Sequence, residues 1–417
     1  MKYKIIGGHK LEGKVNVSGS KNSVFPCVAA ALLTSDEVIL ENVSNLKDTE
    51  VLIAILRKLG ISVEKNKSTL VIKASDINKF SLPENLMTKL RGSIVLVGAL
   101  LGRLNRVNFY HPGGDIIGKR SIETHLEAFK ELGGSVKKDN SKYSLTLDQK
   151  KNSDIFLSEA SVTATENLVL ASVLGDGQII LRNCAKEPHI IDLCRMLTQM
   201  GAKIEGTGGD TLKITGVGRL NGTKYRISAD YLEIGTYIIA SAITGGQIRI
   251  EGLRDEDLDP VLVPLRNFGI RMERDAASII VYPSKLRSIS KLTTNIWPGF
   301  PTDLMSVAIV LATQSQGITL CHDWMYEGRM FFTDKLISMG AKITLADPHR
   351  VLVSGPGRLR GRNLESPDIR AGMALVVAAL GAKGKSIINQ AELIERGYED
   401  VTLKLKSLGA DIVREGV

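Results

Sequence analysis

A short glycine-rich segment of this 417-residue chain combines one carboxylate with two basic side chains. Residues 111–120 read HPGGDIIGKR, so that Asp115 lies near the expected tip of a turn and Lys119 and Arg120 follow it. Glycine-rich turns followed by cations often bind phosphate, because backbone N–H groups and positive charge attract an anion. A carboxylate at the tip would repel that anion. The residue types alone therefore leave the role of Asp115 open.

Two further segments place a cation at the expected start of an apolar helix. VSGSKN ends in Lys21 and Asn22, and KLRGSIVLVGALL carries Arg91 ahead of an apolar run. Each has an ordinary interpretation: a helix cap followed by a solvated lysine, and an arginine that reaches solvent along its own stem. The alternative is an anion site, in which helix N–H groups and the cation bind a phosphate or carboxylate. For Lys21 the segment alone favours the ordinary interpretation.

Acidic and basic groups also occur together in the C-terminal half. WPGFPTDLMS places Asp303 in a proline-rich turn before an apolar helix, where it could equally be a helix N-cap or a reactive carboxylate. YEGRM contains Arg329, SPDIRAGMALVVAA contains Asp368 and Arg370, and IERGYED contains Arg396. Carboxylates beside fixed cations suit proton transfer next to a bound anion.

The composition disfavours several other classes of protein. The net charge is +9, but the bases are dispersed and aromatic residues make up only 5%, which argues against a nucleic-acid groove. The longest uncharged apolar run, 93–102, is too short to span a bilayer, and the N-terminus lacks a signal-peptide core, so we expect a cytoplasmic protein that does not enter a membrane. The cysteines are scattered, so we expect buried thiols rather than metal ligands.

A repeated pattern supplies the elements that must position these groups. An amphipathic helix ends in a bulky apolar residue and a glycine, and a strand follows, about every seventy residues: LRKLGISVE, FKELGGSVK, LTQMGAKIE, LRNFGIRME, LISMGAKIT and LKSLGADIV. Glycine there suits the left-handed cap that releases the chain into a strand. Small-residue apolar helices such as VAAALLT and LVVAALGA repeat in phase and should be buried. Six copies predict two globular domains of three units each.

This organisation resembles the enolpyruvyl transferase family over essentially the whole chain. The resemblance implies an α/β fold of two inside-out α/β barrel domains, built from six βαβαββ-type repeats with three per domain. One domain would comprise residues 21–229 and include a mobile loop at 111–121, and the other would comprise residues 1–20 plus 230–417. The active site is then expected in the cleft between the domains.

The resemblance also assigns roles to the cations. VSGSKN matches the family's SGxKN signature, and SPDIRAG and IERGYED match its DxRA and RGY motifs, which reverses the ordinary interpretation of Lys21. Each charge-assisted hydrogen bond contributes about 1.5 to 3 kcal/mol, so several converging cations would bind a small polyanion strongly. The residues implied to bind phosphoenolpyruvate and its phosphate are Lys21, Arg91, Arg120, Arg370 and Arg396.

The loop at 111–121 resembles the PGGCxIGxRP loop of family members that act on UDP-N-acetylglucosamine, which members acting on shikimate 3-phosphate lack. The resemblance implies transfer of the enolpyruvyl group of phosphoenolpyruvate to the sugar 3-hydroxyl, with release of phosphate, in the first committed step of peptidoglycan synthesis. No metal or organic cofactor is required, and we expect a monomer. The implied UDP-sugar contacts are Asn22, Arg91, Arg120, Ser121, Ile122, Glu123, Thr124, Ser161, Val162, Asp303, Met325 and Arg329.

The implied catalytic groups are Asp303, as the base for the hydroxyl or its orienting partner, and Asp115, as the acid for carbon 3, with Lys21, Asp368 and Arg396. Most family members carry cysteine in place of Asp115. An ordinary cysteine is mostly protonated at pH 7, whereas an ordinary aspartate is only about 0.1% protonated, so this acid would need a pKa raised by about 3. The missing thiol also predicts resistance to fosfomycin, which alkylates the loop cysteine.

The acceptor end departs most from the family pattern. Ala160 stands where a lysine is common, Thr163 where glycine is, Tyr231 where arginine is, and Gly328 where asparagine is. Lys119 replaces a small residue and either compensates the charge lost at Ala160 or reflects surface drift. An enolpyruvyl transferase with a different acceptor, such as another nucleotide sugar or shikimate 3-phosphate, is therefore the alternative.

Overall fold

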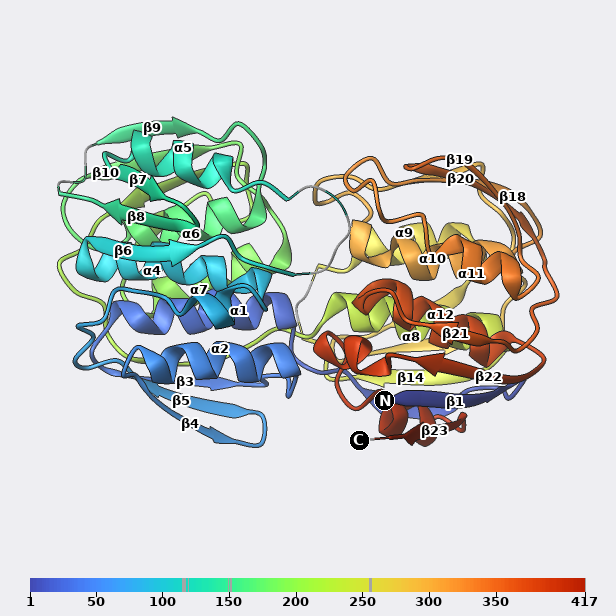
Figure 1. The fold of residues 1–417 in the computed structure, drawn as a ribbon. Coiled ribbons are helices and arrows are strands. Elements are labelled where there is room, and N and C mark those ends of the chain that lie inside the picture. The colour runs from blue at the N-terminus through green and yellow to red at the C-terminus, as the bar shows by residue number, and fades with distance from the viewer. Residues whose placement is uncertain (115–117, 119, 149, 151, 255–256, 417) are drawn as a thin grey trace. The chain divides into compact units, whose positions relative to one another are not determined.

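The computed structural model describes residues 1–114, 118, 120–148, 150, 152–254 and 257–416. The chain divides into two compact units, which we call the central unit (Gly19–Gly114 and Arg120–Ser228) and the terminal unit (Met1–Ser18 and Ala229–Val417). In each unit, helices lie among three small sheets (Figure 1). Each unit has its own apolar core, because buried residues 24–227 form one cluster and those of 3–17 and 229–412 form another.

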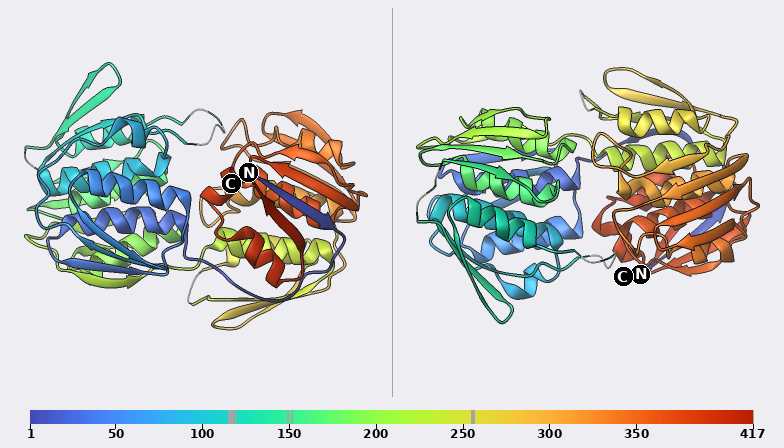
Figure 2. Two further views of the ribbon diagram at one scale, coloured as in Figure 1. Left: turned by 60° about the horizontal axis from the view of Figure 1, so that its bottom comes forward. Right: turned by 90° about the horizontal axis from the view of Figure 1, so that it is seen from above.

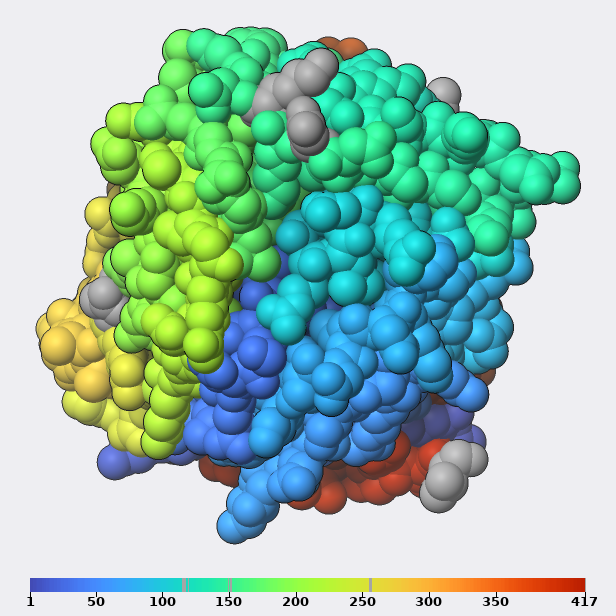
Figure 3. Space-filling model, turned by 90° about the vertical axis from the view of Figure 1, so that its left-hand side faces the viewer, coloured from blue at the N-terminus to red at the C-terminus, as the bar shows by residue number. Residues whose placement is uncertain are grey.

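The central unit contains eleven strands among its described residues: β3 (Glu37–Glu41), β4 (Ser62–Asn66), β5 (Thr69–Lys73), β6 (Arg106–Tyr110), β7 (Ser135–Asp139), β8 (Lys142–Thr146), β9 (Ser153–Phe156), β10 (Gln178–Arg182), β11 (Lys203–Glu205), β12 (Thr211–Thr215) and β13 (Thr223–Arg226). Its helices are α1 (Lys21–Ala30), α2 (Lys47–Lys58), α3 (Glu84–Met87), α4 (Val95–Leu104), α5 (Glu123–Glu131), α6 (Val162–Ser172) and α7 (Pro188–Gln199), with 3-10 turns η1 (Ala31–Leu33) and η2 (Arg91–Ile94). Figure 3 views this unit, in which segments of its three repeats, coloured blue, teal and green, meet on one face.

The terminal unit contains the strands β1 (Lys2–Gly7), β2 (Glu12–Asn16), β14 (Gln247–Glu251), β15 (Arg271–Arg274), β16 (Ser278–Tyr282), β17 (Lys291–Thr293), β18 (Gly317–His322), β19 (Lys342–Asp347), β20 (Arg350–Gly355), β21 (Asn363–Glu365), β22 (Gly384–Asn389) and β23 (Asp411–Glu415). Its helices are α8 (Tyr231–Thr244), α9 (Asp259–Asn267), α10 (Met305–Gln314), α11 (Thr333–Ser338), α12 (Ile369–Gly381) and α13 (Val401–Ser407), with 3-10 turns η3 (Thr302–Leu304) and η4 (Ala391–Arg396). The two ends of the chain lie side by side, because β1 pairs with β23 (Figure 2).

The sheets repeat one design, as the sixfold sequence pattern predicts. The strand orders in the described residues are β13-β3-β5-β4, β6-β8-β7, β11-β12-β10-β9, β15-β16-β14-β2, β17-β18-β20-β19 and β21-β22-β1-β23. Each four-stranded sheet joins one parallel edge strand to three antiparallel strands, for example β13 to β3 and β2 to β14. In the three-stranded sheet a single parallel bridge from Ser81 to Asn108 stands in place of that edge strand. The predicted inside-out α/β architecture of six repeats is confirmed.

The helix-ending glycines behave as predicted. All six have a positive φ, between +85° and +105°, which other residues adopt only with strain: Gly60, Gly133, Gly201, Gly269, Gly340 and Gly409. The bulky residue before each glycine is at most 1% exposed, so the cap also fixes an apolar contact with the core. The glycine and its neighbour therefore set where each repeat turns from helix into strand.

The apolar helices form the inside of each unit, also as predicted. In the central unit α4 packs on α6 so closely that a Cβ at Gly98 would lie 2.2 Å from the carbonyl oxygen of Asn167. The side-chain oxygen of that asparagine accepts a hydrogen bond from the Gly98 N–H at 2.6 Å. The glycine thus lets the two buried helices approach so closely that a backbone N–H of α4 bonds to a side chain of α6. No helix in the described part of the chain is long and apolar enough to cross a membrane.

Candidate active site

Lys21 begins α1 and is not a solvated lysine. Ser20 caps the helix by accepting from the Ser23 N–H, and the Lys21 side chain is only 10% exposed. Its Nζ donates to Asp48 at 2.6 Å, at the start of α2, and lies 5.9 Å from the centre of the Phe25 ring. A buried ammonium needs a fixed anion to offset its desolvation, and Asp48 supplies one. The sequence did not single out Asp48, which reads as an ordinary acidic residue in a first helical turn.

Arg91 holds the segment that follows the glycine-rich loop. It lies in η2, one short turn before α4, and its Nη2 donates to the carbonyl oxygen of Ser121 at 2.9 Å. The start of the loop is tightly packed, since a Cβ at Gly113 would lie 1.7 Å from the carbonyl oxygen of Thr88. A Cβ at Gly114 would lie 2.8 Å from Cβ of Arg91 and 3.3 Å from Nη1 of Arg120. Arg91 and Arg120 therefore lie close together beside the loop. Asp115 and Lys119, predicted as an acid and an anion contact, fall outside the described residues.

The predicted UDP-sugar contacts of the central unit lie at the starts of α5 and α6. Ser121 accepts from the Glu123 N–H at 3.1 Å, Ile122 is buried beneath this turn, and Thr124 contacts Ser158. Ser161 caps α6 and accepts from the Ala164 N–H at 3.4 Å, and Val162 is the first helical residue. A helix start offers N–H groups to an anion, which fits a diphosphate.

Thr163, which stands where the family has glycine, is bonded to a buried histidine. Its Oγ1 lies 2.9 Å from Nε2 of His125, which is 3% exposed and whose Nδ1 has no hydrogen-bond partner among the described residues. Burial and then the charge of Arg91 lower the pKa of His125 to about 3. The imidazole is therefore neutral at physiological pH and links α5 to α6.

The His125 environment predicts a pH-dependent stability. The unfolded chain protonates this histidine below pH 6.5 whereas the folded chain does not until about pH 3, so stability is lost as the pH falls between those values. Between pH 7 and 5 the wild type should lose about 2 kcal/mol more unfolding free energy than His125→Gln. Urea unfolding at both pH values measures this difference. His9→Gln, at an exposed position, is the control, and equal losses in wild type and His125→Gln would contradict the prediction.

Asp303 lies at the centre of an ion-pair cluster in the terminal unit. Its Oδ1 accepts from Nη2 of Arg329 at 2.9 Å, and its Oδ2 accepts from Nε and Nη2 of Arg370 at 3.1 and 3.0 Å. The N-caps of η3 and α10 are Pro301 and Leu304, so Asp303 caps neither and that alternative is wrong. The two arginine side chains are 2% and 7% exposed, whereas that of Asp303 is 30% exposed. A carboxylate that reaches solvent is thus backed by two buried cations.

Burial opposes the charge of Arg329, but Asp303, Asp323 and Asp368 outweigh it and raise its pKa, so this arginine stays protonated. Asp323, which the sequence did not indicate as a site residue, is completely buried and lies 3.9 Å from Arg329 Nε. Met325 lies two residues later, and its N–H donates to Asp323 Oδ1 at 3.0 Å. Met325 and Arg329, both predicted to contact the UDP-sugar, therefore lie against the same buried carboxylate, Asp323.

Arg370 is the second residue of α12 and combines burial with spare donors. Asp368 caps this helix by accepting from the N–H groups of Arg370 and Ala371 at 2.7 and 2.9 Å, which gives that carboxylate a structural role. The guanidinium lies 5.4 Å from the centre of the Tyr398 ring, and its buried Nη1 has no hydrogen-bond partner in the described part of the chain. Such a donor suits an incoming anion. Arg396, at the end of η4, is half-buried.

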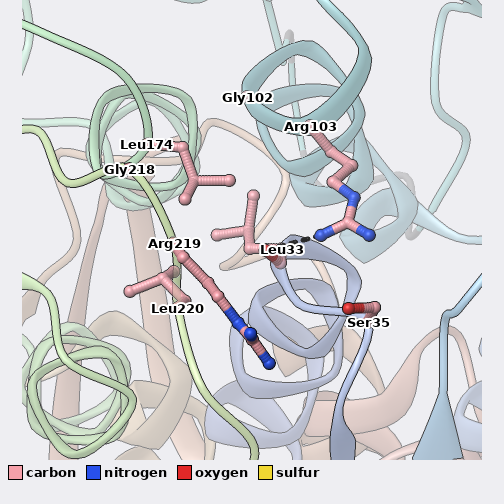
Figure 4. Close-up of a pocket in the computed structure, with 8 residues that line it drawn as sticks. All are labelled: Leu33, Ser35, Gly102, Arg103, Leu174, Gly218, Arg219 and Leu220. Carbon is pink, nitrogen blue, oxygen red and sulfur yellow. Dashed lines mark hydrogen bonds between the residues drawn. The ribbon is translucent and has the colours of Figure 1, made fainter.

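A pocket of about 440 Å³ opens elsewhere, where η1, α4 and α6 end (Figure 4). It holds none of the predicted site residues, and its cations are already engaged: Nη1 of Arg103 donates to the Leu33 carbonyl at 3.1 Å, and Arg219 pairs with Asp36 at 2.8 Å. Positive charge at helix C-termini offsets their carbonyl dipoles, so this arrangement is structural. No group of three or more potential metal ligands occurs among the residues that the structure describes.

Comparisons with known proteins agree with the fold. Residues 5–405 match the family described as EPSP synthase (3-phosphoshikimate 1-carboxyvinyltransferase). The chain is 44% identical to a UDP-N-acetylglucosamine 1-carboxyvinyltransferase of Treponema denticola, covering 98% of each chain. It is also 44% identical to one of Bradyrhizobium diazoefficiens, covering 99% of this chain and 98% of the relative.

Solved structures extend the comparison. The enolpyruvyl transferase NikO from Streptomyces tendae is similar with a TM-score of 0.89 and 25% identity, covering 99% of this chain and 98% of its own. EPSP synthase from Acinetobacter baumannii is similar with a TM-score of 0.80 and 19% identity, covering 100% of each chain, which bears on the fold alone.

The sixfold fold and its similarity to a solved enolpyruvyl transferase thus place the chain in the class of enolpyruvyl transferases. It belongs to the EPSP synthase family and, within it, to the UDP-N-acetylglucosamine 1-carboxyvinyltransferases, which confirms the resemblance.

Proposed function

We propose that this protein transfers the enolpyruvyl group of phosphoenolpyruvate to the 3-hydroxyl of UDP-N-acetylglucosamine and releases phosphate, as the first committed step of peptidoglycan synthesis. The activity named for its relatives, UDP-N-acetylglucosamine 1-carboxyvinyltransferases, supports the acceptor. The observation that carries the chemistry is Asp303, a partly exposed carboxylate held by Arg329 and Arg370. The two arginines compensate its charge and fix its orientation, so that this carboxylate can act as the base for the hydroxyl proton.

In this reaction the two carboxylates transfer protons, and the cations stabilise negative charge. The sugar oxygen forms a bond to carbon 2 of phosphoenolpyruvate while Asp303 accepts the hydroxyl proton and an acid, assigned to Asp115, protonates carbon 3. In the second step carbon 3 loses a proton, the bond from carbon 2 to the phosphate oxygen breaks, and phosphate leaves. Fixed positive charge stabilises both the carboxylate and the leaving phosphate.

The cations of both units are proposed to bind this one polyanion. Lys21, Arg91 and Arg120 belong to the central unit, and Arg370 and Arg396 to the terminal unit. The buried Nη1 of Arg370 supports the assignment, because a bound anion would satisfy it. Three statements stay predictions: that residues of both units build the site, that the active species is a monomer, and that the protein is cytoplasmic.

A transferase of the same class with another acceptor is the second candidate. Two observations favour it: Thr163 is bonded to His125, and Tyr231, where an arginine is common, packs on Trp297 with ring centres 5.2 Å apart. Both changes replace groups expected at the acceptor end.

Phosphate release from phosphoenolpyruvate tests both candidates. Release that depends on UDP-N-acetylglucosamine supports the proposed function, and release only with shikimate 3-phosphate or with another nucleotide sugar supports the second candidate. No release with any of these acceptors would refute both.

A further inference from the structure

We propose that Asp323, which lies outside the groups assigned to substrate, is a positioning residue that fixes Asp303 through Thr302 and Arg329. The inference rests on the proposed function, because it concerns the orientation of the base. It also explains why a fully buried carboxylate lies next to the acceptor segments.

Asp323 joins three separate segments of the terminal unit. It follows the last residue of β18, and its side chain is 0% exposed. Oδ1 accepts from the Met325 N–H at 3.0 Å and from Oγ1 of Thr294 at 3.2 Å, while Oδ2 accepts from the hydroxyl of Thr302. One carboxylate therefore ties the end of β17, the turn before Asp303 and the loop before Arg329.

The backbone of Asp323 is fixed as well. Its N–H donates to the carbonyl oxygen of His349 at 2.9 Å, and its carbonyl oxygen lies 2.7 Å from Nδ1 of the same histidine. His349 lies in the turn between β19 and β20, and β20 pairs with β18 in the same sheet. The anchor thus lies directly after a strand and is bonded to the turn between two strands of the same sheet, which restrains it more than a free loop would.

The charges alternate from this anchor to the exposed carboxylate. Oδ2 of Asp323 lies 3.9 Å from Nε of Arg329, whose Nη2 donates to Asp303 at 2.9 Å, and Arg370 completes the row. Arg329 is buried between two carboxylates, so its position depends on both. Without Asp323, the positive charge of the Arg329 guanidinium would be balanced by Asp303 alone of these two carboxylates. The guanidinium would then draw the Asp303 carboxylate away from substrate.

The second connection acts through the backbone. Thr302 is the residue before Asp303 and follows Pro301, whose φ of −72° is restricted by its ring. Because its hydroxyl donates to Asp323, the peptide that carries Asp303 is held at the same buried carboxylate as the arginine that orients the side chain. A displacement of about 1 Å in a reacting group can cost about a hundredfold in rate.

Asp323→Asn tests the proposal with little change in shape. The amide keeps one acceptor oxygen but turns an N–H₂ group or a neutral oxygen towards Arg329. We expect kcat to fall about tenfold to a hundredfold while KM for phosphoenolpyruvate stays within about twofold, since Asp323 bonds to Thr294, Thr302, Met325 and Arg329 and Arg370 joins the row only through Asp303. Asp334→Asn, at a 69% exposed side chain in α11, is the matched control and should leave both parameters unchanged. An unchanged kcat, or an equal change in kcat and KM, overturns the proposal.

Thr302→Val provides an independent test, because it removes the hydroxyl and leaves the Asp323 charge. We expect its kcat to fall and the double variant to be no slower than Asp323→Asn alone, whereas multiplicative losses overturn the proposal. Thermal unfolding of each variant distinguishes a fall in kcat caused by misfolding from one caused by misplacement of Asp303. The assay uses the acceptor that supports phosphate release by the wild type, so a wild type that rejects UDP-N-acetylglucosamine refutes the proposed function without deciding this comparison.

Discussion

Asp303→Asn is expected to lower kcat by about 10²- to 10⁴-fold, the usual contribution of a positioned general base. An amide cannot accept the hydroxyl proton. It would also place an N–H₂ group against Arg329 or Arg370, both of which now donate to this side chain. Steady-state kinetics with both substrates measures the effect, and KM for phosphoenolpyruvate should change less than kcat.

The same substitution leaves two buried arginines without their shared anion, so a loss of stability must be separated from a loss of chemistry. Thermal unfolding shows which fraction is folded under assay conditions, and Asp334→Asn again serves as the exposed control. Arg329→Lys gives a second comparison, since it keeps a charge beside Asp303 but loses the planar fork. A folded Asp303→Asn protein with nearly wild-type kcat would exclude Asp303 as the base.

The fold could be predicted because its information is local and repeated. A helix end with its glycine and bulky neighbour is visible within five residues, and six copies in phase leave few architectures that bury the small-residue helices. The structure has all six glycines at positive φ and all six neighbours buried, so backbone geometry and core packing agree at each repeat. The parallel edge strands were not predictable in this way, because β2 and β13 each pair with a strand distant in sequence.

The site could be predicted only where a motif carries it. Lys21, Asp303 and Arg370 lie in recognisable segments, but their partners depend on contacts across the chain: Asp48 for Lys21 and Asp323 for Arg329. Both of these aspartates look ordinary in sequence, one in a helical first turn and one after a strand. Whether Asp303 caps a helix was likewise undecidable from sequence, because a proline-rich turn before a helix suits both roles. Only the distances to two arginines separate them.

Fosfomycin should leave the wild type fully active and should inactivate Asp115→Cys irreversibly. Alkylation needs a thiolate, and the four native cysteines are all buried. Burial raises the pKa of Cys184, Cys194 and Cys321 to about 12 and that of Cys27 well above its usual range. The wild type therefore offers no reactive thiol, and the variant gains one in the loop at 111–121. Residual activity after incubation and removal of the drug measures both outcomes, and rapid irreversible loss in the wild type would contradict the prediction.

The same variant tests Asp115 as the acid. An acid must hold its proton to work, so kcat falls as the pH rises through its pKa, and the alkaline limb of the pH profile reports that group. In Asp115→Cys this limb should move towards the ordinary thiol value of about 8.5. The neighbouring Gly113 and Gly114 are packed against Thr88, Arg91 and Arg120, so the substitution changes the acid while the start of the loop stays held. A variant that is active with an unmoved alkaline limb would assign proton transfer at carbon 3 to another group, with Lys21 the next to test.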